Sequence, residues 1–189
     1  MILTHDDIPP AIAELGRWLV EGGAVPYGDE PATLLSHGLQ AAALADAAGL
    51  SDALVVACGL HDVAHAWLVC RGGAVLDRDD AHERLGARLL APLLPPGVVE
   101  PVRLHVAAKR RLCASEPGYL ATLSAGSVHS LGLQGGPMDA EDARVFDTEP
   151  FAADALVLRR IDDAAKVPAA PEMPLAVLLG RASRLASLR

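Results

Sequence analysis

The stretch ALVVACGLHD, residues 53–62, decides how the chain is expected to fold. Its first eight residues are apolar or small, which is typical of a helix buried on every side. It then ends on a histidine beside an aspartate. A buried imidazole or carboxylate without partners costs several kcal/mol or shifts its pKa strongly. The stretch therefore predicts a core helix whose last residues need a partner other than water.

The composition of the whole chain favours helices around this segment. The chain has 189 residues, of which 51% are hydrophobic and only 3% aromatic, so the core must consist of Ala, Leu and Val. Ala and Leu are strong helix formers, and no stretch alternates for long in the manner of a strand. We predict one all-α domain over residues 1–189, a helical bundle with a metal centre in its core.

Capping residues, prolines and glycines divide the chain into helices. Ser51 and Ser124 are predicted N-caps, and His61 and His65 are expected to share a face at the end of one helix. The loops are expected at 25–33 and 71–80, with a sharp turn at 134–139. The predicted helices cover 7–21, 33–48, 51–62, 80–91, 98–112, 124–133, 139–147, 150–166 and 173–188, with a short segment through 123.

Charge and cysteine usage indicate the compartment and exclude some partners. The formal net charge of −8 argues against nucleic-acid binding and against an anionic membrane surface. No apolar run approaches the ~18 residues of a spanning helix, and three dispersed cysteines suit a reducing compartment. We expect a cytoplasmic protein. Its only two lysines are Lys109 and Lys166.

Most of the seven histidines lie in or beside apolar helical stretches, while His5 and His129 are interpreted as surface residues. Two acidic positions, at 62 and at 162–163, lie in the same kind of context. Imidazole and carboxylate ligands together suit Fe, Mn or Zn, and one aspartate can bridge two ions. The sequence therefore predicts a metal centre from these candidates: His37, His61, Asp62, His65, His82, His105, Asp162 and Asp163.

The ordered pattern H…HD…H…H…D resembles the HD-domain superfamily, whose usual members are metal-dependent phosphohydrolases. Four stretches narrow the resemblance: YGDEPATLLSHGLQ (27–40), HVAAKR (105–110), LQGGPMD (133–139) and LRRIDDAAK (158–166). They are similar to the phosphonate-cleaving, mixed-valent diiron oxygenases of that superfamily, which are distant relatives of myo-inositol oxygenase. The similarity covers about residues 27–166.

The resemblance implies a role for each matching residue. One iron would be held by His37, His61, Asp62 and Asp162, and the other by His82 and His105 with Asp62 as the bridge. Tyr27 would occupy an open iron position until substrate binds, and Glu30 would take a cationic amine of the substrate. Tyr27, His65 and Lys109 are the expected catalytic residues. Substrate binding is assigned to Glu30, Gln40, Lys109, Ser127, Gln134 and Arg159.

The activity implied is oxidative cleavage of the carbon–phosphorus bond of a 1-hydroxyalkylphosphonate. The cofactors would be two Fe ions in a mixed-valent Fe(II)/Fe(III) state, with O₂ as co-substrate. From 2-amino-1-hydroxyethylphosphonate the products would be glycine and inorganic phosphate. The alternatives are an HD phosphohydrolase acting on a phosphate ester or nucleotide, and a non-enzymatic domain with a structural metal site. The oligomeric state stays open.

Some positions depart from the family pattern. Ala64 replaces a usual glycine, Asp29 adds a carboxylate beside Glu30, and Ile161 stands where an aromatic residue is common. The segment 66–80 has little similarity. Because every expected metal ligand is present, the departures bear on the substrate more than on the metal centre.

Overall fold

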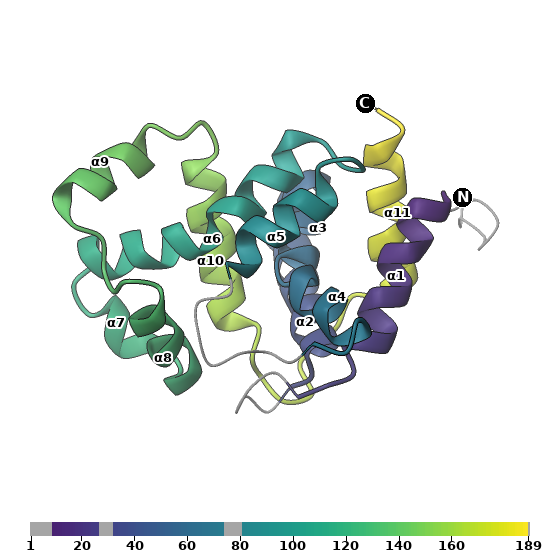
Figure 1. Ribbon diagram of the computed structural model, residues 1–189, viewed down its shortest axis with the longest axis horizontal. Helices are drawn as coiled ribbons and strands as arrows, with labels where there is room; N and C mark the ends of the chain where they lie inside the picture. The colour runs from purple at the N-terminus through teal and green to yellow at the C-terminus, as the bar shows by residue number, and fades with distance from the viewer. Residues whose placement is uncertain (1–8, 27–31, 74–80, 189) are drawn as a thin grey trace.

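A computed structural model describes residues 9–26, 32–73 and 81–188. Within these residues the chain is all helical, and the only β-type pairing is an isolated bridge between Pro26 and Thr33. The predicted all-α fold is confirmed (Figure 1). The helices are α1 (Pro10–Gly22), α2 (Leu34–Ala47), α3 (Asp52–Leu60), α4 (Val63–Cys70), α5 (His82–Leu90), α6 (Pro96–Ser115), α7 (Tyr119–Thr122), α8 (Ala125–Leu133), α9 (Ala140–Asp147), α10 (Ala152–Ala164) and α11 (Leu175–Ala186).

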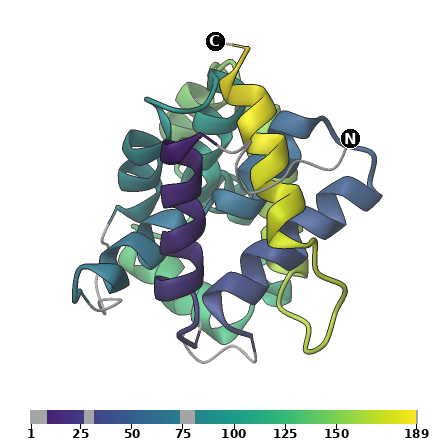
Figure 2. The same cartoon turned by 90° about the vertical axis from the view of Figure 1, so that its right-hand side faces the viewer.

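Helix α3 forms the centre of the main core. Every residue from 54 to 60 is buried, because α2, α6, α10 and α11 all pack against this helix. Figure 2 shows α1 and α11 side by side on the outer surface of this part of the molecule. Burying a leucine or valine side chain contributes about 1.5–3 kcal/mol, so the apolar run 53–60 anchors the bundle.

The prediction that His61 and His65 share a face at the end of one helix is wrong. Helix α3 ends at Leu60, α4 begins at Val63, and the two helices are bent by 42° at the break. The imidazole of His61 donates from Nδ1 to the carbonyl of Cys58, 2.8 Å away, and so satisfies a carbonyl of the last turn of α3. Because the helix breaks, His61 and His65 do not share a helical face.

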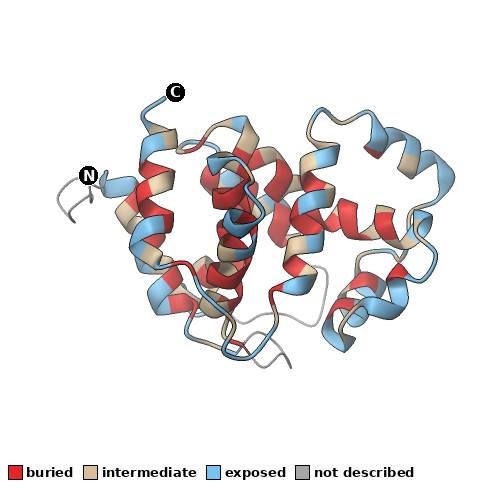
Figure 3. Cartoon of the chain, turned by 180° about the vertical axis from the view of Figure 1, so that it is seen from behind, coloured by how far each residue is buried: buried red, intermediate tan, exposed pale blue. Residues whose placement is uncertain are grey.

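Helices α6 and α10 extend beyond this core to a second, smaller group of helices (Figure 1). There α7, α8 and α9 lie at one end of the molecule, and Figure 3 shows that their surfaces are largely exposed. A small apolar cluster around Leu104, Ala108, Phe146 and Ala155 joins α6, α9 and α10. Helix α8 buries only Ser127 and Leu131, so it has little apolar attachment of its own.

Most helix boundaries match the sequence prediction. Ser51 Oγ accepts a hydrogen bond from Leu54 N, and Ser124 Oγ accepts one from Ser127 N, which confirms both predicted N-caps. Helix α10 is shorter than predicted and ends at Ala164, so Lys166 lies just beyond it. Helix α6 is longer, at 20 residues, and contains Pro101.

Among the described residues, no single helix is long and apolar enough to cross a membrane. The bent pair α3 and α4 meets the length and composition test only when its two helices are taken together.

Close packing of α1 against α4 generates a stability prediction. A Cβ atom at Gly22 would collide with the backbone carbonyl of Ala66 on α4. We expect Gly22→Ala to lower the free energy of unfolding by about 1–3 kcal/mol in a denaturant titration. Gly132→Ala on α8 is the matched control, because nothing lies within 4 Å of a Cβ there. Equal stability of both variants would contradict the close approach.

Candidate metal centre and its neighbouring cations

Two histidines from separate helices face one another in the core. His37 on α2 and His61 at the end of α3 are both buried, and their Nε2 atoms lie 3.1 Å apart. The Oδ1 atom of Asp162, on α10, lies 3.2 Å from Nε2 of His37 and 3.7 Å from Nε2 of His61. Three candidate ligands therefore converge on one point from three helices.

Backbone carbonyls fix the tautomer of these imidazoles. His37 Nδ1 donates to the carbonyl of Ala165 at 2.9 Å, and His61 Nδ1 donates to Cys58. Since a carbonyl oxygen only accepts, Nδ1 carries the proton and a neutral ring presents its lone pair at Nε2. Two facing lone pairs repel each other unless a proton or a metal cation lies between them. The donor set and its orientation therefore fit a metal ion.

A second pair repeats this arrangement. His82 opens α5 and His105 lies within α6, and their Nε2 atoms are also 3.1 Å apart. His105 Nδ1 donates to the carbonyl of Val102 at 2.8 Å, so its lone pair also points toward its partner.

Asp62 lies between the two pairs. Its Oδ1 atom is 3.4 Å from His82 Nε2 and 3.8 Å from His105 Nε2. Its Oδ2 atom is 3.5 Å from His61 Nε2 and 3.9 Å from His37 Nε2. One carboxylate thus offers one oxygen to each pair, which is the geometry that a bridging ligand needs.

His65 lies in the second group rather than beside His61. Its ring stacks on that of His82 with centroids 4.4 Å apart. Ligand atoms of His65, His82 and Asp62 all lie within 4.8 Å of one another. His65 thus lies beside the second pair of histidines, at the edge of the centre.

The charges of the two pairs differ when no ion is bound. Burial disfavours a charged His61, but the carboxylates of Asp62 and Asp162 outweigh burial and raise the pKa of His61 to about 9. Burial, together with His82 and His61, holds the pKa of His105 well below its usual value. A proton on His61 therefore occupies the place of a cation at neutral pH, and a metal must displace it.

Asp162 connects the centre to a neighbouring group of cations. Its Oδ2 atom lies 2.6 Å from Nη1 of Arg159, while Oδ1 lies 3.8 Å from Nζ of Lys166. Burial opposes the ionised carboxyl, but Arg159 and Lys166 outweigh it and hold the pKa of Asp162 well below its usual range. Asp162 is thus a permanent anion shared between the histidines and the cations.

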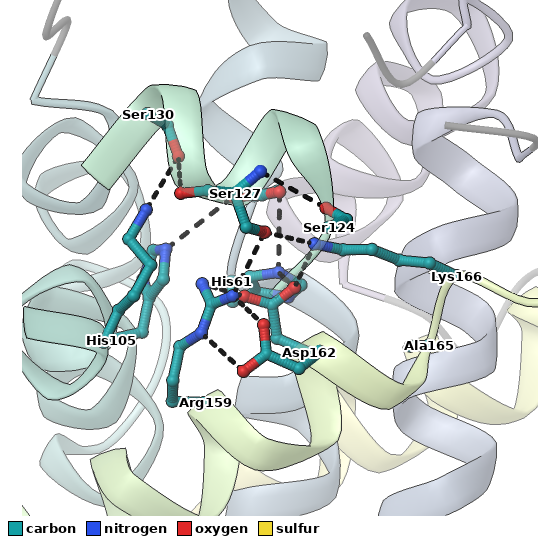
Figure 4. A network of polar contacts seen from close by, with 12 residues as sticks. His61, His105, Ser124, Ser127, Ser130, Arg159, Asp162, Ala165 and Lys166 are labelled. Atoms are coloured by element: carbon teal, nitrogen blue, oxygen red, sulfur yellow. Dashed lines mark hydrogen bonds and ion pairs between the residues drawn. The ribbon is translucent and has the colours of Figure 1, made fainter. Parts of the chain in front are cut away.

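Three cations meet the hydroxyl groups of α8. Lys109 Nζ donates to Ser130 Oγ at 2.7 Å, and Lys166 Nζ donates to Ser127 Oγ at 2.8 Å. Nη2 of Arg159 also reaches Ser127 Oγ, at 3.4 Å (Figure 4). Burial, and then Arg159, lowers the pKa of Lys109 to about 8. We call Lys109, Arg159 and Lys166 the cationic cluster; Lys109 and Arg159 are buried and Lys166 is half-buried. Cations that converge in this way on hydroxyl oxygens are the donors that an oxyanion needs.

The other residues that were predicted to be catalytic or to bind substrate have different surroundings. Gln40 is buried and uses its amide to bond Ser36 Oγ and the backbone N–H of Val167, so it holds the chain that carries Lys166. Gln134 ends α8, and its Oε1 atom is buried without a hydrogen-bond partner among residues 9–26, 32–73 and 81–188. The predicted positions Tyr27 and Glu30 lie outside the described residues.

The structure adds polar residues that the sequence prediction did not assign to the site. Lys166, one of the two lysines and the last residue of the stretch 158–166, has no predicted role, yet it lies beside Asp162. Tyr119 is a second such residue: it donates to Asp163, a predicted metal-centre candidate that pairs with Arg159. A serine inside a helix carries no sequence signal, so Ser130 could not have been found in this way.

Two curated proteins are similar to most of the chain. A 1-hydroxy-2-(trimethylamino)ethylphosphonate dioxygenase (glycine-betaine-forming) of Leisingera caerulea is 40% identical over 145 residues, which are 76% of this chain and 74% of that protein. A hydroxymethylphosphonate dioxygenase of Gimesia maris is 39% identical over 151 residues, 79% of this chain and 75% of that protein.

A third relative carries no functional name. It is an uncharacterized protein of Acanthamoeba polyphaga mimivirus, 29% identical over 148 residues, 77% of this chain and 68% of that protein. No family model matches the chain.

The geometry predicts two metal ions per chain that share Asp62. In anaerobic calorimetry we expect two Fe²⁺ ions to bind, more tightly as the pH rises from 6 toward 8. The reason is that His61, with a pKa of about 9 in the ion-free site, must lose its proton. Asp62→Asn should weaken both ions, and Asp162→Asn only one. His129→Ala, at an exposed position, is the control. A single ion, or affinity that falls with rising pH over this range, would contradict the arrangement.

Proposed function

The chain belongs to the phosphonate dioxygenase family, and we propose that it uses O₂ to cleave the carbon–phosphorus bond of a 1-hydroxyalkylphosphonate and release inorganic phosphate. Its relatives in Leisingera caerulea and Gimesia maris are both named as dioxygenases of such hydroxylated phosphonates. The observation that carries the proposal is Asp62, with one oxygen facing each pair of imidazoles.

We propose iron as the metal, in two positions. His37, His61, Asp62 and Asp162 would hold one ion, and His82, His105 and Asp62 the other. Imidazole and carboxylate ligands suit iron, and Nδ1 bonds to backbone carbonyls keep the lone pairs turned inward. When bound, a mixed-valent iron pair would supply the redox chemistry with O₂.

The cationic cluster beside this centre would bind the phosphonate group. A phosphonate carries up to two negative charges near neutral pH, and Lys109, Arg159 and Lys166 are the cations grouped around Ser127 and Ser130. When substrate binds, these cations would donate to the phosphonate oxygens in place of the serine hydroxyl oxygens of α8. Lys109 lies one turn after His105 on α6, so the anion would lie next to the metal centre.

The proposed reaction balances with one O₂ molecule. A 1-hydroxyalkylphosphonate loses its C1 hydrogen and its carbon–phosphorus bond, and C1 becomes a carboxylate while phosphorus leaves as phosphate. This is a four-electron oxidation of the substrate, and one O₂ accepts the four electrons. Lys109 and Arg159 would stabilise the charge on the departing phosphate, and the buried ligands would keep bulk water from the reacting carbon.

An HD phosphohydrolase is the competing hypothesis, and O₂ dependence separates the two. The iron-loaded protein is tested with hydroxymethylphosphonate and with 2-amino-1-hydroxyethylphosphonate. We expect at least one of them to release one phosphate per O₂ consumed. Phosphate release should stop under argon, and the Asp62→Asn variant should be inactive in both conditions. Turnover of a phosphate ester by the zinc or magnesium form without O₂ would support hydrolysis instead.

The substituent that C1 of the substrate carries besides its hydroxyl and phosphonate groups is a separate question. One relative is named for a trimethylamino substrate and the other for hydroxymethylphosphonate, which has no amine. We propose that Glu30 takes a cationic amine of the substrate and that Tyr27 occupies an open iron position before substrate binds. The enzyme is proposed to act in the cytoplasm on this small molecule, without nucleic-acid or membrane partners.

Glu30→Gln tests this assignment, because it removes the charge and keeps the shape. We expect kcat/KM for 2-amino-1-hydroxyethylphosphonate to fall by about tenfold or more, as loss of one charge pair of at least ~1.4 kcal/mol implies. Hydroxymethylphosphonate serves as the internal control and should change less than about twofold. Equal losses on both substrates would show that Glu30 does not select the amine.

A further inference from the structure

Arg159 is held by two aspartates that are neighbours in the sequence. Asp163 takes the Nε and Nη2 edge of the guanidinium: Nε lies 3.2 Å from Oδ2, and Nη2 contacts Oδ1. This is the two-bond fork that fixes the plane of an arginine. Nη1 is left to contact Asp162 Oδ2 at 2.6 Å.

Asp163 is in turn anchored by a residue outside the metal centre. The hydroxyl of Tyr119, on the short helix α7, donates to Oδ2 of Asp163. Tyr119 and Asp163 also line a surface hollow of about 660 Å³. The contacts therefore run from the buried Tyr119, beside this hollow, through Asp163 and Arg159 to Asp162.

This chain of contacts determines how Asp162 is turned. Because Arg159 reaches Asp162 by Nη1, it contacts Oδ2, while Oδ1 points toward His37 and His61. The Oδ1 atom is buried and accepts no hydrogen bond in the described part of the chain. If the fork of Arg159 were released, the same guanidinium could engage both oxygens of Asp162 and draw Oδ1 away from the histidines.

We propose that Asp163, anchored by Tyr119, is a positioning residue: it occupies the fork of Arg159 and thereby keeps Asp162 Oδ1 available to a metal ion. The inference rests on the proposed function, in which Asp162 is a metal ligand. The two adjacent aspartates therefore have different roles: Asp162 faces the metal site, and Asp163 holds Arg159, which orients Asp162.

Metal affinity tests the proposal without relying on turnover. In anaerobic calorimetry with Fe²⁺, Asp163→Asn should weaken one of the two ions by about 10–100-fold, the loss expected when a supporting partner of a ligand is removed. Tyr119→Phe should weaken the same ion by about two- to tenfold, because one hydrogen bond to the carboxylate is lost. Asp163→Glu should restore part of the affinity.

The matched control is Asp147→Asn. Asp147 makes the same type of fork with Arg111, at 2.9 Å and 2.9 Å, but on the exposed surface of α6 and α9. It should leave both Fe²⁺ affinities unchanged. In an Arg159→Leu background, adding Asp163→Asn should change the affinity less than about twofold, since Asp163 acts through Arg159.

Each outcome decides the question. Parent-like Fe²⁺ affinity in Asp163→Asn, alongside weakened binding in Asp162→Asn, would overturn the positioning role and leave the proposed function standing. Unchanged binding in Asp162→Asn would overturn both. If circular dichroism shows that Asp163→Asn does not fold, Tyr119→Phe decides, because the phenyl ring keeps its packing; unchanged affinity in that variant would overturn the positioning role.

Discussion

The buried carboxylate of Asp62 is the constraint on which the rest of the structure depends. It lies 6% exposed among four imidazoles, and its two oxygens face different pairs. A carboxylate in such a place is tolerated only when positive charge surrounds it, and the histidines hold its pKa well below the usual value against the effect of burial. Every helix that supplies one of these imidazoles packs around the same point. The fold is therefore organised around a place for cations as much as around its apolar core.

Two helices place residues of the metal centre beside residues of the cationic cluster through the same helical spacing. Helix α6 carries His105 and Lys109 four residues apart, and α10 carries Arg159 and Asp162 three residues apart. Residues at these spacings lie on one face, one turn from each other. Each helix thus presents one residue to the metal centre and one to the cationic cluster. Because both helices are packed along each other, the distance between the two sites is set by helical geometry.

The cationic cluster concentrates positive charge in a protein whose net charge is −8. The two lysines of the chain and Arg159 are all turned toward α8, where they donate to serine hydroxyl groups. Recognition of an anion there depends on these short-range contacts, since the long-range field of an acidic protein repels it. Helix α8 buries few apolar side chains, so these polar bonds contribute a large share of its attachment to the rest of the molecule.

The sequence by itself determined the helical class, most helix boundaries, and the set of residues that could not be buried without a shared partner. It determined these because apolar periodicity, caps and the free energy of burying polar groups are local properties. Only the tertiary structure decided which imidazoles face each other, that the break after Leu60 turns His65 toward His82, and that Asp163 holds Arg159 while Asp162 faces the histidines. A helical spacing predicts a common face only while the helix continues, and contacts between distant helices depend on how the bundle packs.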